Sequence, residues 1–257
     1  MKRRLTFPAL LLTAAAAMAQ TTVSPSARVL LIGDSTMATR NGYGDALCAR
    51  LRPGVECLNL AKNGRSSGSF RAEGLWEAAM AHLQTPVPTW VLIQFGHNDQ
   101  PGKPGRSTDL QTEYPVNLAR YVADVRQLGA TPVLVTPLTR RTFKGDQLQN
   151  DLLPWAESMK TVAKQSGVAL IDLNTLSFQA VQVMGQAQAD TLATEPPPAE
   201  PVQSASTATT EVVTTKKSTF DRTHVGIKGA QLFSGMVIDA ARAVPGLVGL
   251  VALVRAD

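Results

Sequence analysis

Two polar blocks near opposite ends of the chain hold the residue types of a catalytic triad. Ser35 lies in Gly-Asp-Ser-Thr-Met at residues 33–37, and His224 ends Asp-Arg-Thr-His at residues 221–224. A serine nucleophile needs a base within hydrogen-bond reach and a third group that orients the base. Asp221, three residues before His224, can reach the far imidazole nitrogen and fix its tautomer. The pattern predicts Ser35 as nucleophile, His224 as base and Asp221 as the orienting carboxylate.

Two further blocks supply donors for an oxyanion. Gly64 lies in Asn-Gly-Arg-Ser at residues 63–66, and Asn98 lies in Gly-His-Asn-Asp at residues 96–99. A glycine lets a substrate approach the backbone closely, and one neutral amide donor is typically worth about 3 kcal/mol of barrier. We expect an oxyanion hole made by the backbone N–H groups of Ser35 and Gly64 and by the side-chain amide of Asn98. Each block alone is also an ordinary turn or helix cap, so the prediction rests on the four together.

A second serine competes for the role of nucleophile. Ser66 stands in Gly-Arg-Ser-Ser-Gly at residues 64–68, which satisfies the Gly-x-Ser-x-Gly elbow of α/β-hydrolases. That elbow requires an apolar strand to run directly into its first glycine, whereas Lys62 and Asn63 intervene here. Ser35 therefore remains the preferred nucleophile. The three histidines and two cysteines are scattered without ligand spacing, so no metal site is predicted, and His82 is expected at the surface.

Five short apolar runs predict the strands that position these blocks: residues 28–32, 55–59, 90–95, 132–136 and 168–172. Residues 110–128 and 152–162 between them have helical spacing. Near-continuously apolar strands separated by helices indicate a parallel sheet covered on both faces. The predicted fold class is α/β, a doubly wound five-stranded parallel sheet between helices. Ligands bind such sheets beyond the carboxyl ends of the strands, where three of the blocks fall.

One segment interrupts this pattern. From about residue 185 to 217 the chain becomes rich in Pro, Ser, Thr and Ala, a composition that cannot bury enough apolar surface to offset its ordering entropy. We predict a mobile, low-complexity insertion in an otherwise single domain over residues 20–257. Helical periodicity returns at residues 227–244. The apolar tail at 247–254 is too short to span a bilayer and is expected to pack against the body.

Residues 1–19 predict export. They consist of three cations, an apolar run and a final Ala-Met-Ala, the layout of a cleavable secretory signal. Its removal would lower the net charge of +5 by three, so nucleic-acid binding is not indicated. We expect a periplasmic or secreted protein with no membrane span after cleavage. Cys48 and Cys57 are the only cysteines, and an oxidising compartment predicts that they form a disulfide.

The ordered blocks carry a family resemblance. Ser35, Gly64, Asn98 and His224, with Asp221 before the histidine, resemble the four blocks of SGNH (GDSL-type) hydrolases. Gly-Asp-Ser-Thr-Met, Gly-Arg-Ser-Ser, Phe-Gly-His-Asn-Asp, Thr-Pro-Leu-Thr-Arg-Arg and Asp-Arg-Thr-His are similar in particular to the rhamnogalacturonan acetylesterases. That resemblance implies a flavodoxin-like SGNH fold, no cofactor, and hydrolysis of acetyl esters on pectin-type sugars. Two features depart from the subfamily, namely the insertion before the Asp-His block and the apolar Val-Gly-Ile after His224.

Basic residues after the strands suggest an anionic substrate. Arg65, Arg71, Arg140, Arg141 and Lys144 lie on or near such segments, where they either ring the mouth of the cleft or belong to solvated loops. The candidate substrate-binding residues are Asp34, Arg65, His97, Arg140 and Arg141. Arginines at the cleft would favour a galacturonate-containing polymer, whose carboxylates they bind bidentately.

The sequence thus predicts an exported, monomeric carbohydrate acetylesterase with a Ser-His-Asp triad, acting on acetylated polysaccharide or oligosaccharide through an acyl-enzyme. Two alternatives stay open. A GDSL-type lipase or lysophospholipase would use the same chemistry, and is favoured if the apolar tail lines the cleft. A non-catalytic carbohydrate-binding protein on the same fold is disfavoured by the intact set of Ser, Asp, His and Asn residues, provided that they converge in space.

Overall fold

The computed structural model describes residues 25–84, 86–195 and 220–256. The signal predicted at residues 1–19 and most of the predicted insertion lie outside these ranges. In chain order the elements are β1 Ala27–Gly33, α1 Gly44–Cys48, β2 Val55–Asn59, α2 Ser69–Ala72, α3 Leu75–Met80, η1 Ala81–Leu83, β3 Thr89–Gln94, α4 Tyr114–Gln127, β4 Thr131–Val135, β5 Phe143–Lys144, β6 Gln147–Leu148, α5 Leu153–Ser166, β7 Ala169–Ile171, α6 Leu173–Asp190, α7 Ile227–Arg242, η2 Pro245–Leu247 and α8 Val248–Val251.

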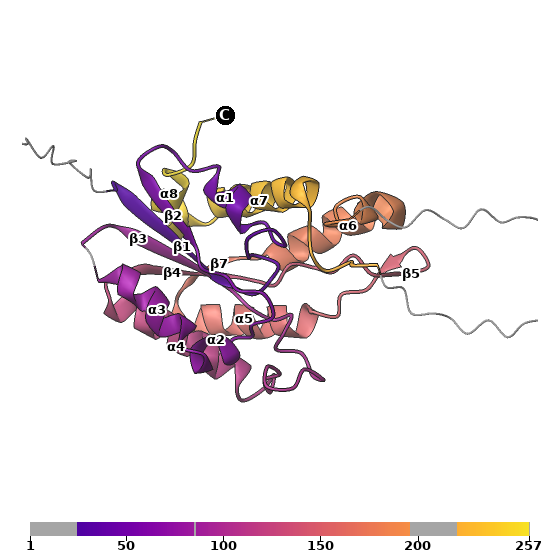
Figure 1. Ribbon diagram of the computed structural model, residues 1–257, viewed down its shortest axis with the longest axis horizontal. Helices are drawn as coiled ribbons and strands as arrows, with labels where there is room; N and C mark the ends of the chain where they lie inside the picture. Colours follow the sequence, from indigo (N-terminus) through magenta and orange to yellow (C-terminus); the bar gives the residue numbers. More distant parts are fainter. Residues whose placement is uncertain (1–24, 85, 196–219, 257) are drawn as a thin grey trace, which may run out of the picture.

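A five-stranded parallel sheet forms the centre of the described chain, in the order β2-β1-β3-β4-β7. Helices α1, α6, α7 and α8 lie over one face, and α2, α3, α4 and α5 lie over the other (Figure 1). The predicted strands and the doubly wound α/β fold are confirmed. The short antiparallel pair β5 and β6 is an addition that the sequence pattern did not reveal.

The sheet is buried on both faces, which explains the unbroken apolar runs of its strands. In β1, Val29 and Leu31 pack into the core under α7, whereas Leu30 and Ile32 pack into the core under α4 and α5. Alternate residues of a strand point to opposite faces, so a strand covered on both sides must be apolar at every position. This packing holds the carboxyl ends of β1, β3 and β4 at one edge of the sheet.

Helix α4 is shorter than the predicted 110–128. Pro115 is placed at its first turn, where the missing N–H costs no hydrogen bond. Before it, the Asp109 carboxylate accepts hydrogen bonds from the backbone of Gln111 and Thr112 and thereby holds a turn. The helix ends before Gly129, whose φ of 74° is left-handed, and Leu128 is 38% exposed rather than buried with the helix face.

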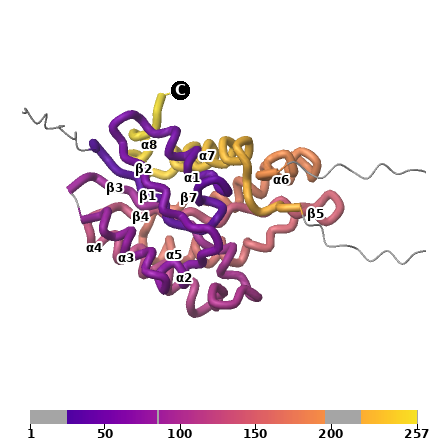
Figure 2. Tube along the Cα trace, in the orientation of Figure 1, coloured from indigo at the N-terminus to yellow at the C-terminus, as the bar shows by residue number. Residues whose placement is uncertain are grey.

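The C-terminal segment lies beside elements from the start of the chain (Figure 2). Leu247, Leu250 and Leu253 are buried in the core that also holds α1. Val254 pairs with Leu51 in an isolated antiparallel bridge. The apolar tail therefore packs on the body, as predicted. No single helix among the described residues is long and apolar enough to cross a membrane; only α7 taken with Pro245–Val251, across a bend of 109°, would suffice by length and composition.

The predicted start of the insertion is wrong. Helix α6 continues past residue 185 to Asp190, with a kink at Gly185, whose φ is 70°. Ala189 and Leu192 are buried in the core, and Asp190 forms an ion pair with Arg222. The sequence of residues 185–195 does not reveal this extension of the helix. Only two of its apolar side chains are buried in the core, and Gly185 interrupts the helical periodicity. The remainder of the predicted insertion, residues 196–217, lies outside the described ranges.

Candidate active site

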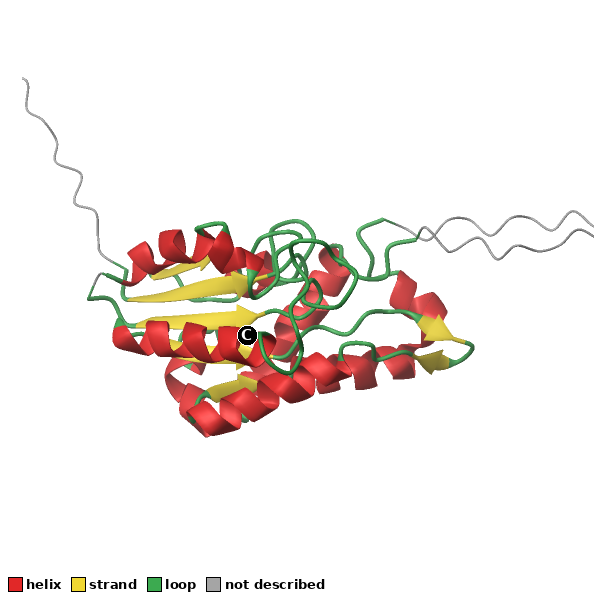
Figure 3. Cartoon of the chain, turned by 90° about the horizontal axis from the view of Figure 1, so that it is seen from below, coloured by secondary structure: helices red, strands yellow, loops and turns green. Residues whose placement is uncertain are grey.

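The loops that follow the strands gather at one edge of the sheet (Figure 3). Ser35 lies in the turn directly after β1 and is 5% exposed. Asp34 holds that turn, because its Oδ1 accepts hydrogen bonds from the backbone N–H of Thr36 (2.9 Å) and from the Thr36 hydroxyl (2.8 Å). A hydroxyl is therefore held at the carboxyl end of a rigid central strand.

Ser35, His224 and Asp221 form one chain of hydrogen bonds. His224 Nε2 lies 2.7 Å from Ser35 Oγ, and His224 Nδ1 lies 2.7 Å from Asp221 Oδ2. The second carboxylate oxygen, Oδ1, accepts hydrogen bonds from the backbone N–H groups of Thr223 (2.8 Å) and His224 (3.0 Å). Burial alone would raise the pKa of Asp221, but these hydrogen bonds and the imidazole outweigh it and lower the pKa. Asp221 is thus kept ionised and able to hold Nδ1–H, which leaves Nε2 free to accept the serine proton.

The other two predicted oxyanion donors, Gly64 and Asn98, lie on two loops that hydrogen bonds join together. Gly64 has a φ of 77°, a left-handed conformation that favours glycine. Asn98 Nδ2 donates to the Arg65 carbonyl at 3.1 Å, and since an amide nitrogen carries two hydrogens, one remains for another acceptor. Asp99, which the sequence analysis did not assign, joins the loops because its Oδ1 accepts from Ser67 N (3.0 Å) and Ser67 Oγ (2.6 Å). Its only signal in the sequence is its place directly after Asn98.

The chain matches known proteins over the part of this site that holds Ser35, Gly64 and Asn98, whereas Asp221 and His224 lie beyond the match. Residues 31–198 match the GDSL-like lipase/acylhydrolase family. The chain belongs to this family. The predicted resemblance is therefore confirmed, and with it the class of carboxylic ester hydrolases.

Curated relatives of this hydrolase are named as rhamnogalacturonan acetylesterases. The chain is 35% identical over 152 residues to "Probable rhamnogalacturonan acetylesterase YesY" of Bacillus subtilis, which is 56% of this chain and 69% of the relative. It is 36% identical over 154 residues to rhamnogalacturonan acetylesterase RhgT of the same organism, covering 57% and 64%. The match to RhgT thus spans less than two thirds of that relative.

Solved structures share the fold. LAE5, an α/β hydrolase enzyme from the metagenome of Lake Arreo, Spain, aligns with a TM-score of 0.59 and 19% identity over 85% of this chain and 96% of that one. A variant of Axe2, an acetylxylan esterase from Geobacillus stearothermophilus, aligns with a TM-score of 0.56 and 17% identity over 86% and 96%. At this identity the likeness concerns the fold alone.

Three of the residues predicted to contact substrate are buried structural residues of the hydrolase. Asp34 is 0% exposed and His97 is 2% exposed, and His97 Nδ1 lies 3.2 Å from Asp34 Oδ2. Burial alone would raise the pKa of Asp34, but His97 and the Thr36 hydrogen bonds lower it. This pair links the turn after β1 to the loop after β3. The printed contacts give both residues a structural role, and contact of either with the substrate stays a prediction.

Arg141 is the third. Its guanidinium is 0% exposed and donates to the carbonyls of Asp221 (3.1 Å) and His224 (2.7 Å). Its backbone N–H donates to the Arg222 carbonyl at 2.9 Å. Arg141 thus fastens the Asp-Arg-Thr-His block to the segment after β4. A sequence pattern shows the charge of an arginine, but it does not show that backbone carbonyls will accept its hydrogen bonds.

The other arginines predicted near the mouth are paired with carboxylates. Arg65 contacts Glu73 at 2.7 Å, and Arg71 contacts Asp124 at 2.7 Å. Arg140 forms an ion pair with Asp151, and its Nε donates to the Thr223 hydroxyl at 3.2 Å. These pairs reduce the net positive charge that the sequence places at the cleft.

Ser66 is enclosed by its own loop. It is 0% exposed, its Oγ accepts from Ser69 N at 3.1 Å, and it lies 3.2 Å from Ser69 Oγ. None of the hydrogen bonds in the described chain joins Ser66 to a histidine or a carboxylate. Its geometry lacks the base that a nucleophile elbow needs. Among the other sequence expectations, His82 is exposed, as predicted, and Cys48 and Cys57 are joined in a disulfide between α1 and β2.

Proposed function

We propose that this hydrolase is an exported carbohydrate O-acetylesterase that works through an acetyl-enzyme on Ser35. The observation that carries the proposal is the unbroken chain from Ser35 Oγ through the His224 imidazole to the Asp221 carboxylate. A hydroxyl, a base and an orienting carboxylate in this order are the parts that acyl transfer requires.

The first half of the reaction forms the acyl-enzyme. Ser35 Oγ attacks the acetyl carbonyl while His224 Nε2 takes the hydroxyl proton. The backbone N–H groups of Ser35 and Gly64 and the free amide hydrogen of Asn98 donate to the oxyanion that develops. His224 then gives its proton to the sugar oxygen as the ester bond breaks, which leaves acetyl-Ser35 and a free sugar hydroxyl.

The second half restores the enzyme. Water loses a proton to His224 Nε2 and attacks the acetyl-Ser35 carbonyl, and the same donors hold the oxyanion. Collapse of this intermediate breaks the bond to Ser35 Oγ, which recovers its proton from His224. Acetate leaves, and Asp221 stabilises the imidazolium in both halves.

The proposed substrate is an acetylated, galacturonate-containing polysaccharide of the rhamnogalacturonan type. The names of two curated relatives at 35% and 36% identity support this choice. A lipase is less well supported, because the apolar tail at 247–254 packs into the core rather than lining a cleft. Export is supported by the signal pattern of residues 1–19 and by the disulfide, since disulfides persist in oxidising compartments.

A series of p-nitrophenyl esters tests the class of reaction. We expect kcat/KM to be highest for the acetyl ester and to fall as the acyl chain lengthens. A rise toward long chains would favour the lipase alternative, and no turnover of any ester would favour a binding protein. Acetate release from acetylated rhamnogalacturonan and from acetylated xylan, compared at equal acetyl content, then tests the substrate. Equal kcat/KM on the two polymers would contradict the proposed substrate and leave the esterase chemistry intact.

A further inference from the structure

A basic side chain lies against the backbone of Gly64. The Arg106 guanidinium nitrogen Nη1 lies 3.2 Å from the point where a Cβ on Gly64 would stand. Arg106 is half-buried, and it comes from the loop after β3 rather than from the Gly64 loop itself. The sequence analysis did not select it, because nothing in the local sequence links residue 106 to residue 64.

The loop that carries Arg106 is held by its own hydrogen bonds. The Arg106 backbone N–H donates to the Lys103 carbonyl at 3.0 Å. The Ser107 hydroxyl accepts from Lys103 N at 2.9 Å and donates to the Gln100 carbonyl at 2.8 Å. Lys103 Nζ in turn donates to the backbone carbonyl of His97, next to Asn98. Arg106 is therefore presented from a fixed loop.

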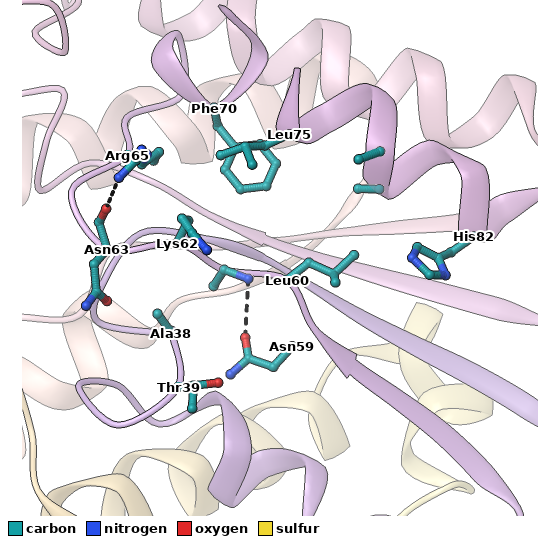
Figure 4. Close-up of a pocket in the computed structure, with 13 residues that line it drawn as sticks. Ala38, Thr39, Asn59, Leu60, Lys62, Asn63, Arg65, Phe70, Leu75 and His82 are labelled. Carbon is teal, nitrogen blue, oxygen red and sulfur yellow. Dashed lines mark hydrogen bonds between the residues drawn. The ribbon is translucent and has the colours of Figure 1, made fainter. Parts of the chain in front are cut away.

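A second basic side chain comes from the loop that holds Gly64, two positions before it. Lys62 lines a pocket of about 450 Å³ beside the edge strand β2 (Figure 4). The pocket has apolar walls from Leu60, Phe70 and Leu75 and polar groups from Asn59 and Asn63. Apolar walls with a few polar groups suit a sugar ring, which has both apolar faces and hydroxyl edges.

Among the described residues, neither cation is paired with a carboxylate. In the described ranges, Arg106 and Lys62 have no hydrogen-bond or ion-pair partner for their side chains, whereas Arg65, Arg71 and Arg140 each contact a carboxylate. Positive charge also gathers around Arg106. Burial and then the charges of Arg140 and Arg106 lower the pKa of Lys103, against the attraction of two carboxylates. An anionic ligand at Gly64 would relieve this repulsion.

We propose that Arg106, with Lys62 in support, binds a carboxylate of the acidic polymer close to the acetyl ester that is hydrolysed. The proposal rests on the proposed function and adds the residues that recognise its charge. A guanidinium binds a carboxylate through two parallel hydrogen bonds, and a half-buried one does so with little screening by salt. The carboxylate is fixed beside the oxyanion donor Gly64, which sets the neighbouring ester over Ser35.

Variants of Arg106 test this role in the full-length mature protein. Arg106→Met removes the charge and keeps most of the length, and Arg106→Lys keeps the charge without the fork. Arg52→Met is the control, because Arg52 is exposed and precedes the amino end of β2, whereas Gly64 follows the carboxyl end of that strand. Substrates are an acetylated galacturonate-containing oligosaccharide, the same oligosaccharide with methyl-esterified carboxyls, and p-nitrophenyl acetate.

We expect Arg106→Met to raise KM for the acidic oligosaccharide by about tenfold or more, the scale of one charged hydrogen-bond pair. In Arg106→Met, KM for the methyl-esterified oligosaccharide and kcat for p-nitrophenyl acetate should stay within about twofold of the parent values. All kinetic constants of Arg52→Met should do the same. KM of Arg106→Lys for the acidic oligosaccharide should lie between those of the parent and Arg106→Met, since an ammonium cannot form the bidentate contact. Lys62→Met should raise KM for the acidic oligosaccharide by a smaller factor, because Lys62 is exposed.

Two outcomes would overturn the proposal. An unchanged KM for the acidic oligosaccharide in Arg106→Met would contradict the proposed contact between Arg106 and the carboxylate. An equal loss of kcat on all three substrates would instead assign Arg106 to the oxyanion.

Inhibition of p-nitrophenyl acetate hydrolysis by the unacetylated acidic oligosaccharide separates this proposal from the proposed function. Carboxylate binding predicts a Ki that rises in Arg106→Met, whether or not the acetylated form is turned over. Failure to release acetate from the oligosaccharide would contradict the proposed substrate alone. A Ki that is the same in the parent and in Arg106→Met would contradict the role of Arg106.

Discussion

Arg141 donates a hydrogen bond of 2.7 Å from its guanidinium to the backbone carbonyl of His224. The same group donates to the carbonyl of Asp221 at 3.1 Å, so one buried cation holds both ends of the Asp-Arg-Thr-His block. Burial lowers the pKa of Arg141 to about 10, which leaves it charged at neutral pH. The imidazole position opposite Ser35 thus depends on a residue that contacts neither the substrate nor the reacting atoms.

Replacing Arg141 should therefore reduce turnover more than substrate binding. We expect Arg141→Met to lower kcat for p-nitrophenyl acetate by about 10- to 100-fold, since a displacement of about 1 Å can cost that much. KM should change little, and Arg141→Lys should recover part of kcat. Steady-state kinetics check the split between the two constants.

Arg126→Met is the control for Arg141. Arg126 also donates to two backbone carbonyls, those of Ser166 (2.7 Å) and Gly167 (2.8 Å), but at the far end of α4 from the site. The Arg126→Met variant should have a lower free energy of unfolding than the parent but an unchanged kcat. Equal kcat in the Arg141 and Arg126 variants at a temperature where both are folded would reject a positioning role for Arg141.

Ser35→Ala should abolish almost all esterase activity. We expect kcat to fall by at least about 10³-fold, the scale of losing a triad member. Ser66→Ala should keep most activity, because among the described residues the Ser66 hydroxyl bonds only to Ser69 and is enclosed by its loop. Rates of p-nitrophenyl acetate hydrolysis at matched concentrations of folded protein decide between the two. A larger loss at Ser66 would contradict the assignment of the nucleophile.

Asp99 should make the protein less stable as pH rises. Burial raises the pKa of Asp99 to about 6, against hydrogen bonds from Ser67 and Thr108. A carboxyl whose pKa is higher in the folded state stabilises the fold below its unfolded pKa of about 4, and that stability is lost as pH rises through about 6. A pKa difference of this size corresponds to roughly 3 kcal/mol.

Asp99→Asn isolates this effect, because the amide oxygen can still accept from Ser67 and carries no charge. The free energy of unfolding by urea, measured for both proteins from pH 4 to pH 7, gives the comparison. The free energy of unfolding of the parent should be higher at pH 4 than at pH 7. Asp99→Asn should lack the part of this difference that the raised pKa causes. A difference between the two proteins that does not change with pH would contradict the raised pKa.

The disulfide should stabilise the edge of the sheet at β2. Cys48 and Cys57 are separated by nine positions, and in the chain-entropy model closing such a loop is worth about 2.5 kcal/mol. Replacing both by serine should lower the free energy of unfolding by that order while kcat stays near the parent value. Intact mass after alkylation without reductant checks the bond, and two added labels would show free thiols instead.

The sequence by itself determined the strands and the four blocks that hold the candidate catalytic residues. A strand covered on both faces is apolar at each position, so a local run such as residues 29–32 is enough to predict it. A polar block directly after such a strand must lie at the carboxyl edge, which placed Ser35, Gly64 and Asn98. To predict the disulfide, the count of cysteines and the predicted export signal were enough.

Tertiary structure decided what each charged residue does. Arg141 was expected at the cleft but is buried against carbonyls about 80 residues away, and Asp34 was expected to contact substrate but pairs with His97. Arg106 reaches Gly64 across more than 40 positions. Charge pairing depends on distances in space between segments that are far apart in the sequence. No local pattern encodes those distances, whereas the period of apolar burial repeats every few residues and can be found in the sequence.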